Sequence, residues 1–199
     1  MHTLYIVATP IGNLEDISAR ALRILGEVAL IAAEDTRVTS KLLARYNIRT
    51  RLTSYHEHNK RAKQPELLAA LADHDVALVS DAGTPGIADA GADLVAAASE
   101  AGAAVVAIPG PSAVVTAIAV SGIAVEQYVF AGFLPRRSAD RRRLLAGLAR
   151  DPRAVVAFET PQRIAASLAD ALDALGDRRI AVCRELTKLH EEVFRGTVS

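Results

Sequence analysis

The most informative part of this sequence is Val76-Ala77-Leu78-Val79-Ser80-Asp81-Ala82-Gly83-Thr84-Pro85-Gly86-Ile87. A short apolar run, typical of a buried strand, passes directly into a turn rich in Gly and Pro. A helix-like segment, residues 92–98, comes next. A strand that runs through such a turn into a helix builds a ligand crevice at the carboxyl end of the strand. The stretch therefore predicts an α/β protein with a binding loop after this strand.

Further apolar runs end in the same way. The runs 4–7, 28–33 and 105–108 pass into Ala8-Thr9-Pro10-Ile11-Gly12-Asn13, Glu34-Asp35-Thr36-Arg37 and Pro109-Gly110-Pro111-Ser112, respectively. Taken singly, each Gly/Pro cluster is as consistent with a plain turn as with a binding loop. Because the carboxyl ends of parallel strands meet at one edge of a sheet, their joint position favours a single pocket.

The order of the segments predicts two α/β domains. Up to about residue 122, short β-branched strands alternate with amphipathic helical stretches, which indicates a mostly parallel, Rossmann-like sheet. Alternating strand-like and helix-like segments follow at 128–133, 139–149, 154–158, 161–175 and 179–184. We expect an N-terminal domain of residues 1–122 and a smaller C-terminal domain of residues 123–199. The chain stops just after a strand-like segment, so we expect it to be C-terminally truncated.

Composition excludes several classes of protein. The formal net charge is +0, so no global field attracts the chain to nucleic acid or membranes. The longest apolar segment, 113–125, falls short of the ~20 residues that a membrane helix needs. No signal peptide is visible, and the single cysteine, Cys183, excludes an internal disulfide. We expect a soluble protein of the reducing cytoplasm.

The strand-end loops favour a neutral or cationic ligand. Neither G-x-G-x-x-G after the first strand nor G-x-x-x-x-G-K-[ST] occurs, and the glycine loops hold no lysine. Glu34 and Asp35 end an otherwise apolar strand, where carboxylates border a crevice. Asp35 is equally suited to cap the following helix, with Arg37 paired to it. Asp81 allows the same two interpretations, a structural role or contact with a ligand, and its tight loop favours contact with a ligand.

Two polar stretches are candidates for binding a metal ion or RNA. His56-Glu57-His58 lacks a third ligand at a fitting spacing, so no metal site is expected. With Tyr55 and nearby cationic side chains, this stretch is interpreted as a surface suited to single-stranded nucleic acid. A second basic patch faces few acidic residues and comprises Arg136, Arg137, Arg141, Arg142, Arg143, Arg150 and Arg153. Phosphate contact and a merely solvated arginine-rich helix remain the alternatives for it.

Several ordered motifs resemble one known family. They are the loop 8–14, Ala33-Glu34-Asp35-Thr36-Arg37, the stretch 54–59, the loop 80–86, the loop 109–113 and Arg184-Glu185-Leu186-Thr187-Lys188. In this order they resemble the ribosomal RNA small subunit methyltransferase I family, of the tetrapyrrole-methylase-like superfamily. The chain departs from the family at Ala88-Asp89-Ala90-Gly91, usually Ser-Asp-Pro-Gly, and at Gln162, usually His.

The resemblance implies 2'-O-methylation of a cytidine ribose in small-subunit (16S) ribosomal RNA. It also implies a homodimer and a two-domain fold that binds S-adenosylmethionine between the domains. By motif, the residues implied to bind this donor are Pro10, Ile11, Gly12, Asp81, Ala82, Gly83, Thr84, Ile87, Ala88, Ser112, Ala113, Phe158 and Glu159. The RNA contacts are then expected at Arg136, Arg137, Arg141, Arg142 and Arg143.

A ribose hydroxyl is a poor nucleophile, so a side chain should take its proton as the new bond forms. Asp35, Glu34 and His56 are the candidates, and Arg37 would orient a carboxylate or hold a phosphate. Two other functions stay open. One is a methyltransferase of the same superfamily that acts on a tetrapyrrole precursor or another small acceptor. The other is a ribosome-binding module without catalysis.

Overall fold

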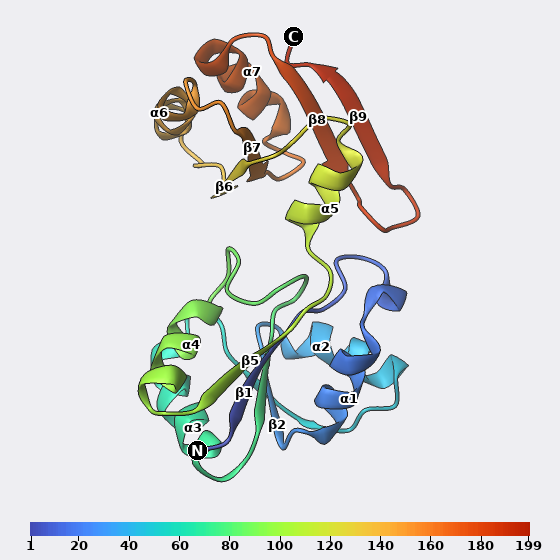
Figure 1. Cartoon of the computed structure of the whole chain (residues 1–199), viewed down its shortest axis with the longest axis vertical. Helices are drawn as coiled ribbons and strands as arrows, with labels where there is room; N and C mark the ends of the chain where they lie inside the picture. The colour runs from blue at the N-terminus through green and yellow to red at the C-terminus, as the bar shows by residue number, and fades with distance from the viewer. The chain divides into compact units, whose positions relative to one another are not determined.

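A computed structural model describes all residues of the chain, Met1–Ser199. They form two compact units, Met1–Ser112 and Ala113–Ser199 (Figure 1). Helix α5 (Ala113–Val120) therefore groups with the second unit, whereas the sequence boundary at residue 122 assigns it to the first. The expectation of an α/β fold with a parallel N-terminal sheet is confirmed.

The first unit is built on a parallel sheet in the order β3-β2-β4-β1-β5. Its strands are β1 (Thr3–Val7), β2 (Leu30–Ala33), β3 (Arg51–Ser54), β4 (Val76–Val79) and β5 (Ala104–Ile108). The apolar runs predicted all of them except β3. This strand lies at one edge of the sheet, and its polar Arg51, Thr53 and Ser54 give no continuous apolar signal.

Helices cover both faces of this sheet (Figure 1). They are α1 (Ala19–Glu27), α2 (Thr36–Arg45), α3 (Lys60–Asp73) and α4 (Gly91–Glu100), with a 3₁₀ turn at Leu14–Asp16. In β4, Ala77 and Val79 pack into the core formed with α1 and α2, while Val76 and Leu78 pack into the core formed with α3 and α4. Burial on both faces explains why this strand reads as an unbroken apolar run.

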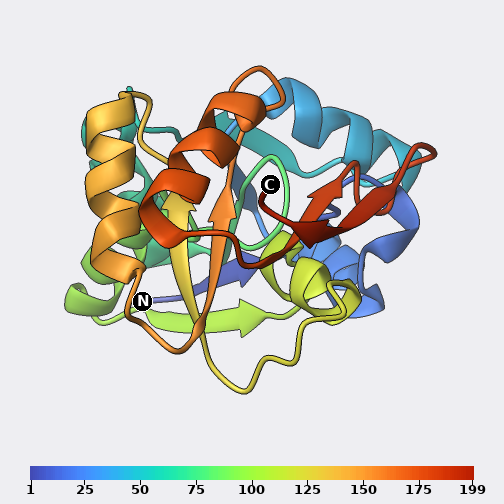
Figure 2. The ribbon, with the colours of Figure 1, turned by 90° about the horizontal axis from the view of Figure 1, so that it is seen from above.

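The second unit contains two short sheets. Strands β6 (Tyr128–Phe133) and β7 (Ala154–Phe158) pair in parallel, and β8 (Arg179–Arg184) and β9 (Glu192–Thr197) pair antiparallel. Helices α6 (Ser138–Leu148) and α7 (Ile164–Leu175) lie side by side (Figures 1 and 2). No helix anywhere in the chain has both the length and the apolar character needed to cross a membrane.

Tyr55 belongs to the core of the first unit and not to a nucleic-acid surface. Its backbone N–H donates to the Ala33 carbonyl at 2.8 Å, which extends the pairing of β3 with β2. The ring is only 2% exposed and packs in the cluster that contains Leu67 and Leu94. The stacking role expected for Tyr55 is therefore wrong, because the pleat of the edge strand directs this side chain inward.

The buried Tyr55 hydroxyl has no hydrogen-bond partner. Tyr55→Phe is therefore expected to raise the free energy of unfolding by about 1 kcal/mol, because it removes an unsatisfied buried polar group. Tyr46→Phe is the matched control, since the Tyr46 hydroxyl donates to the Leu14 carbonyl at 2.6 Å and its loss should destabilise the fold. Urea unfolding measures both. A Tyr55→Phe protein less stable than wild type would show that a buried water satisfies the hydroxyl.

Candidate functional site

The loops after β1 and β4 are joined at the carboxyl edge of the sheet. Thr9 N–H donates to the Gly83 carbonyl at 2.9 Å, and Gly83 N–H donates back to the Thr9 carbonyl at 3.0 Å. The Thr9 hydroxyl also donates to the Ser80 carbonyl at 3.1 Å. Gly83 has a φ of +81°, a conformation that glycine adopts without strain. The bridge brings together the loops at 10–12 and 81–88 that the sequence assigned to a donor.

The loop after β5 lies beside the end of β1. Ala8 N–H donates to the Ile108 carbonyl at 3.2 Å, and a Cβ added at Gly110 would lie 3.0 Å from the Ala8 Cβ. A side chain at residue 110 would therefore be tight against Ala8. Ser112 and Ala113, at the end of this loop, are half-buried. The loops after β1, β4 and β5 therefore form a continuous rim, as parallel topology predicts.

The ends of β2 and β4 exchange hydrogen bonds between side chain and backbone. Asp81 N–H donates to Glu34 Oε2 at 3.2 Å, and Asp35 N–H donates to Asp81 Oδ1 at 2.9 Å. Glu34 N–H also donates to the Val79 carbonyl at 3.3 Å. Glu34, Asp35 and Asp81 are thus neighbours, although they are far apart in the sequence.

Asp35 is the N-cap of α2 and is paired with Arg37. Its Oδ1 accepts from Arg37 N–H at 2.8 Å, and the Arg37 guanidinium binds both carboxylate oxygens at 2.5–3.1 Å. These hydrogen bonds lower the pKa of Asp35 to about 2. The helix-capping alternative is confirmed. A carboxylate with so low a pKa is a weak base.

Glu34 has the opposite environment. Burial is the main cause that raises the pKa of Glu34 above its ordinary value, and the nearby charges of Asp81 and Asp89 add to the effect. The Asp81 N–H and the His56 side chain act in the opposite direction. Asp81 is exposed as a residue, but partial desolvation of its carboxyl group also raises the pKa of Asp81. Of the two adjacent carboxylates, Glu34 is therefore the better proton acceptor near neutral pH.

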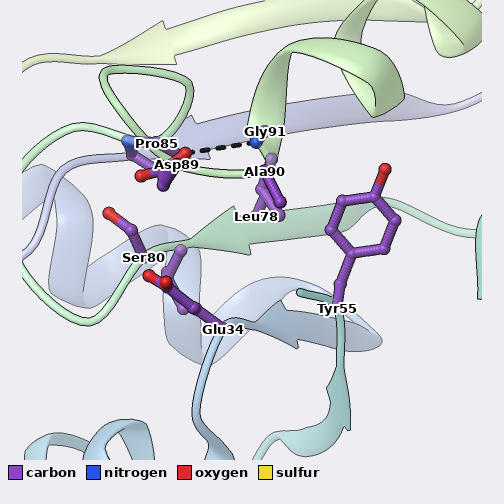
Figure 3. Close-up of a pocket in the computed structure, with 9 residues that line it drawn as sticks. Glu34, Tyr55, Leu78, Ser80, Pro85, Asp89, Ala90 and Gly91 are labelled. Carbon is purple, nitrogen blue, oxygen red and sulfur yellow. Dashed lines mark hydrogen bonds between the residues drawn. The ribbon is translucent and has the colours of Figure 1, made fainter. Parts of the chain in front are cut away.

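A small recess opens beside Glu34 (Figure 3). Its volume is about 10 Å³, close to the room that one water molecule needs. Its lining comprises Glu34, Tyr55, Leu78, Val79, Ser80, Pro85, Asp89, Ala90 and Gly91. The Tyr55 hydroxyl points away from the Glu34 carboxyl. The recess is therefore too small to be a complete ligand site and forms only part of the surface at this edge of the sheet.

Asp89 organises the loop above this recess, a role that the sequence analysis missed. Its Oδ1 accepts from Gly86 N–H at 2.5 Å and from Gly91 N–H at 3.1 Å. A Cβ at Gly91 would lie 2.7 Å from the Gly86 nitrogen, so only glycine fits there. Ala88, between them, has a φ of +66°. The sequence signal for this role is an aspartate within a glycine-rich turn.

The remaining N-terminal candidates lie at the same edge. Pro10 is buried, Ile11 is half-buried and Gly12 is exposed, while Ile87 is 50% exposed. His56 has a buried Nδ1 without a hydrogen-bond partner, and its ring lies 6.0 Å from that of His58. No group of three or more His, Cys, Asp or Glu side chains is placed to hold a metal ion.

Glu159, in the second unit, is fully engaged by its own neighbours. Its carboxylate accepts from Thr160 N–H at 2.7 Å and from the Ser167 hydroxyl at 2.5 Å, and it pairs with Arg163 at 2.5 Å. Burial by itself would raise the pKa of Glu159, but these partners hold it below its ordinary value. The adjacent Phe158 packs in an aromatic cluster with Phe130 and Phe133.

The arginines of the predicted RNA patch differ in their surroundings. Arg136, Arg137, Arg142 and Arg143 are exposed, and Arg142 pairs with Asp173 at 2.9 Å. Arg141 departs from the expectation of an RNA contact, because its side chain is 4% exposed. Its Nε donates to Asp170 Oδ2 at 2.8 Å, so it links α6 to α7.

Comparisons with known proteins identify the family of this chain. Residues 3–199 match the family model of Tetrapyrrole (Corrin/Porphyrin) Methylases. The chain is 50% identical to "Ribosomal RNA small subunit methyltransferase I" of Synechocystis sp., covering 100% of this chain and 72% of the relative. The protein of the same name from Thermotoga maritima is also 50% identical, with 100% and 90% covered.

A solved structure shows the same fold at low sequence identity. The uroporphyrin-III-C-methyltransferase from Thermus thermophilus superposes with a TM-score of 0.67 at 19% identity. The superposition covers 98% of this chain and 85% of that protein.

Proposed function

This chain belongs to the tetrapyrrole methylase family and, within it, to the ribosomal RNA small subunit methyltransferase I family, and on this basis we propose that it methylates the 2'-hydroxyl of a cytidine ribose in small-subunit ribosomal RNA. S-adenosylmethionine is the methyl donor of the family. The observation that carries the proposal is the identity of about half of all residues along the whole chain. A homodimer remains a prediction from the same resemblance, and a cytoplasmic location remains a prediction from the single cysteine.

The rim of the first unit fits a cationic donor. Glu34, Asp81 and Asp89 place carboxylates there, while the Arg37 guanidinium is already paired with Asp35. A negative rim suits a sulfonium and an ammonium group better than a phosphate. Asp81 and Ala82 are exposed and are therefore accessible to the rest of the ligand. Bound S-adenosylmethionine supplies an already reactive methyl group, so the protein contributes mainly by positioning.

We assign Glu34 as the group that takes the proton of the ribose hydroxyl. Its pKa is raised, and the hydrogen bond from Asp81 N–H fixes its carboxylate. Asp35 becomes a positioning residue, since its side chain begins α2 and its backbone N–H holds Asp81. Arg37 then keeps Asp35 in place. RNA phosphates would be held by the exposed Arg136, Arg137 and Arg143.

Donor binding is the first test of this proposal. In calorimetric titration, Asp81→Ala is expected to bind S-adenosylmethionine about tenfold more weakly, because it removes a charge and the acceptor for Asp35 N–H. Asp73→Ala is the control, since Asp73 is an exposed residue at the end of α3, outside this edge. Equal binding by wild type and Asp81→Ala would remove Asp81 from the donor site.

Transfer to RNA is the second test. Radiolabelled methyl transfer to small-subunit ribosomal RNA, followed by alkaline hydrolysis, locates a 2'-O-methyl group by the uncleaved bond that it leaves. Donor binding without transfer to RNA, but with transfer to a tetrapyrrole precursor, would favour the small-acceptor alternative. No donor binding at all would contradict the methyltransferase function of this chain.

A further inference from the structure

An extra residue in β6 sets the direction of Phe133. Phe130 pairs with Val156 and Phe133 with Phe158, so β6 advances three residues while β7 advances two. Gly132, at this bulge, has a φ of +65°, although a Cβ there would meet nothing within 4 Å. The backbone conformation and not crowding therefore calls for glycine. Bulges of this kind re-aim a side chain and are frequent beside functional sites.

The bulge places Phe133 on an aromatic cluster with part of its ring free. Phe158 lies 5.0 Å from Phe130 and 5.3 Å from Phe133, measured between ring centroids. Phe133 is nevertheless 55% exposed. A ring that is supported on one side and open to solvent on the other is a platform on which a nucleic-acid base stacks.

The segment after Phe133 is held by the side chains of two arginines, Arg141, which is buried, and Arg163, which is half-buried. Arg163 Nη1 donates to the Leu134 carbonyl at 3.1 Å, and Arg141 Nη1 donates to the Pro135 carbonyl at 3.1 Å. Leu134 N–H donates to the Phe158 carbonyl at 3.1 Å. The two arginines are fixed in turn by Glu159 and Asp170, respectively. A loop positioned in this way loses little conformational freedom when it binds a ligand.

Two exposed arginines follow this segment in the sequence. The side chains of Arg136 and Arg137 are exposed at the start of α6, and neither forms a salt bridge in the structure. An open aromatic ring beside unpaired guanidinium groups matches the two parts of a nucleotide, its base and its phosphate. An apolar peptide would match the ring but not the pair of arginines.

We propose that Phe133 stacks on an unpaired base of the RNA substrate while Arg136 and Arg137 hold the neighbouring phosphates. This inference rests on the proposed function and names a residue for it that the sequence motifs did not assign. Arg141 and Arg163 are positioning residues in this arrangement, because they act on the loop backbone and not on the RNA.

The chain contains no tryptophan, which provides a direct test. Phe133→Trp introduces a single indole into the platform, and Phe194→Trp introduces one on β9, where Phe194 is also 55% exposed. Titration with single-stranded oligocytidylate is expected to quench the indole emission of Phe133→Trp and to leave that of Phe194→Trp unchanged. Phe133→Leu is expected to weaken binding about tenfold to a hundredfold, and Phe194→Leu to leave it unchanged.

The outcomes separate this inference from the proposed function. Methyl transfer to ribosomal RNA by both leucine variants at the wild-type rate, with no quenching in Phe133→Trp, would overturn the platform and leave the function intact. If RNA quenches the emission of Phe133→Trp but the wild-type protein transfers no methyl group to RNA, the result supports the platform and contradicts the function. If the emission of Phe133→Trp changes with protein concentration but not with RNA, the surface is an interface between copies and the inference fails.

Discussion

Glu34→Gln is expected to lower the rate of methyl transfer by about a hundredfold to ten-thousandfold, because the side chain that accepts the ribose proton is removed. The amide oxygen of Gln can still accept the hydrogen bond that Asp81 N–H donates to Glu34. Donor affinity should therefore change little, and the loss should appear in kcat. Single-turnover transfer of radiolabelled methyl groups measures the rate, and calorimetry measures the affinity.

The pH dependence sharpens this assignment. Wild-type activity should fall as pH drops through the pKa of Glu34, which burial places above its ordinary 4.5, since only the ionised form accepts a proton. Glu34→Gln should lack this step. Asp35→Asn is the companion variant, because Asn keeps the helix cap while losing the Arg37 pair. A large loss of rate in Asp35→Asn, with Glu34→Gln near normal, would reverse the roles of the two carboxylates.

Glu159→Ala is expected to lower the free energy of unfolding by about 3 kcal/mol, because it leaves buried donors without an acceptor. The Ser167 hydroxyl and Thr160 N–H both lose their carboxylate partner, and Arg163 loses its ion pair. Denaturant unfolding followed by circular dichroism measures the change.

Glu185→Ala is the matched control for this variant. Glu185 pairs with Lys188 at 2.9 Å, but both side chains are well exposed, so the change should stay within about 0.5 kcal/mol. The pair also addresses the donor role that motif resemblance implies for Glu159. If Glu159→Ala keeps wild-type stability and loses donor binding, the carboxylate acts on the donor and not on its own unit.

Local patterns were sufficient for most of the fold. The apolar runs predicted β4, β6, β7 and β8 with the residue limits that the structure shows. Strand β4 is readable because both of its faces are buried, whereas β6, β7 and β8 are only partly buried and are readable from their own apolar residues. Strand β3 escaped detection because three of its four residues, Arg51, Thr53 and Ser54, are polar. The meeting of the strand-end loops was also predictable, because parallel strands bring their carboxyl ends to one edge.

The fold class, the family and the loops that form the rim were all predictable, because they depend on residue type and on spacing along the chain. The folded structure was needed to separate the pKa of Glu34 from that of Asp35. It was also needed to show that Tyr55 lies in the core and that Arg141 donates a hydrogen bond to a loop carbonyl. Each of these outcomes depends on burial and on partners distant in the sequence, such as Asp81 for Glu34 and Asp170 for Arg141. A carboxylate or guanidinium acquires its pKa and its function from such neighbours, and folding decides which neighbours it meets.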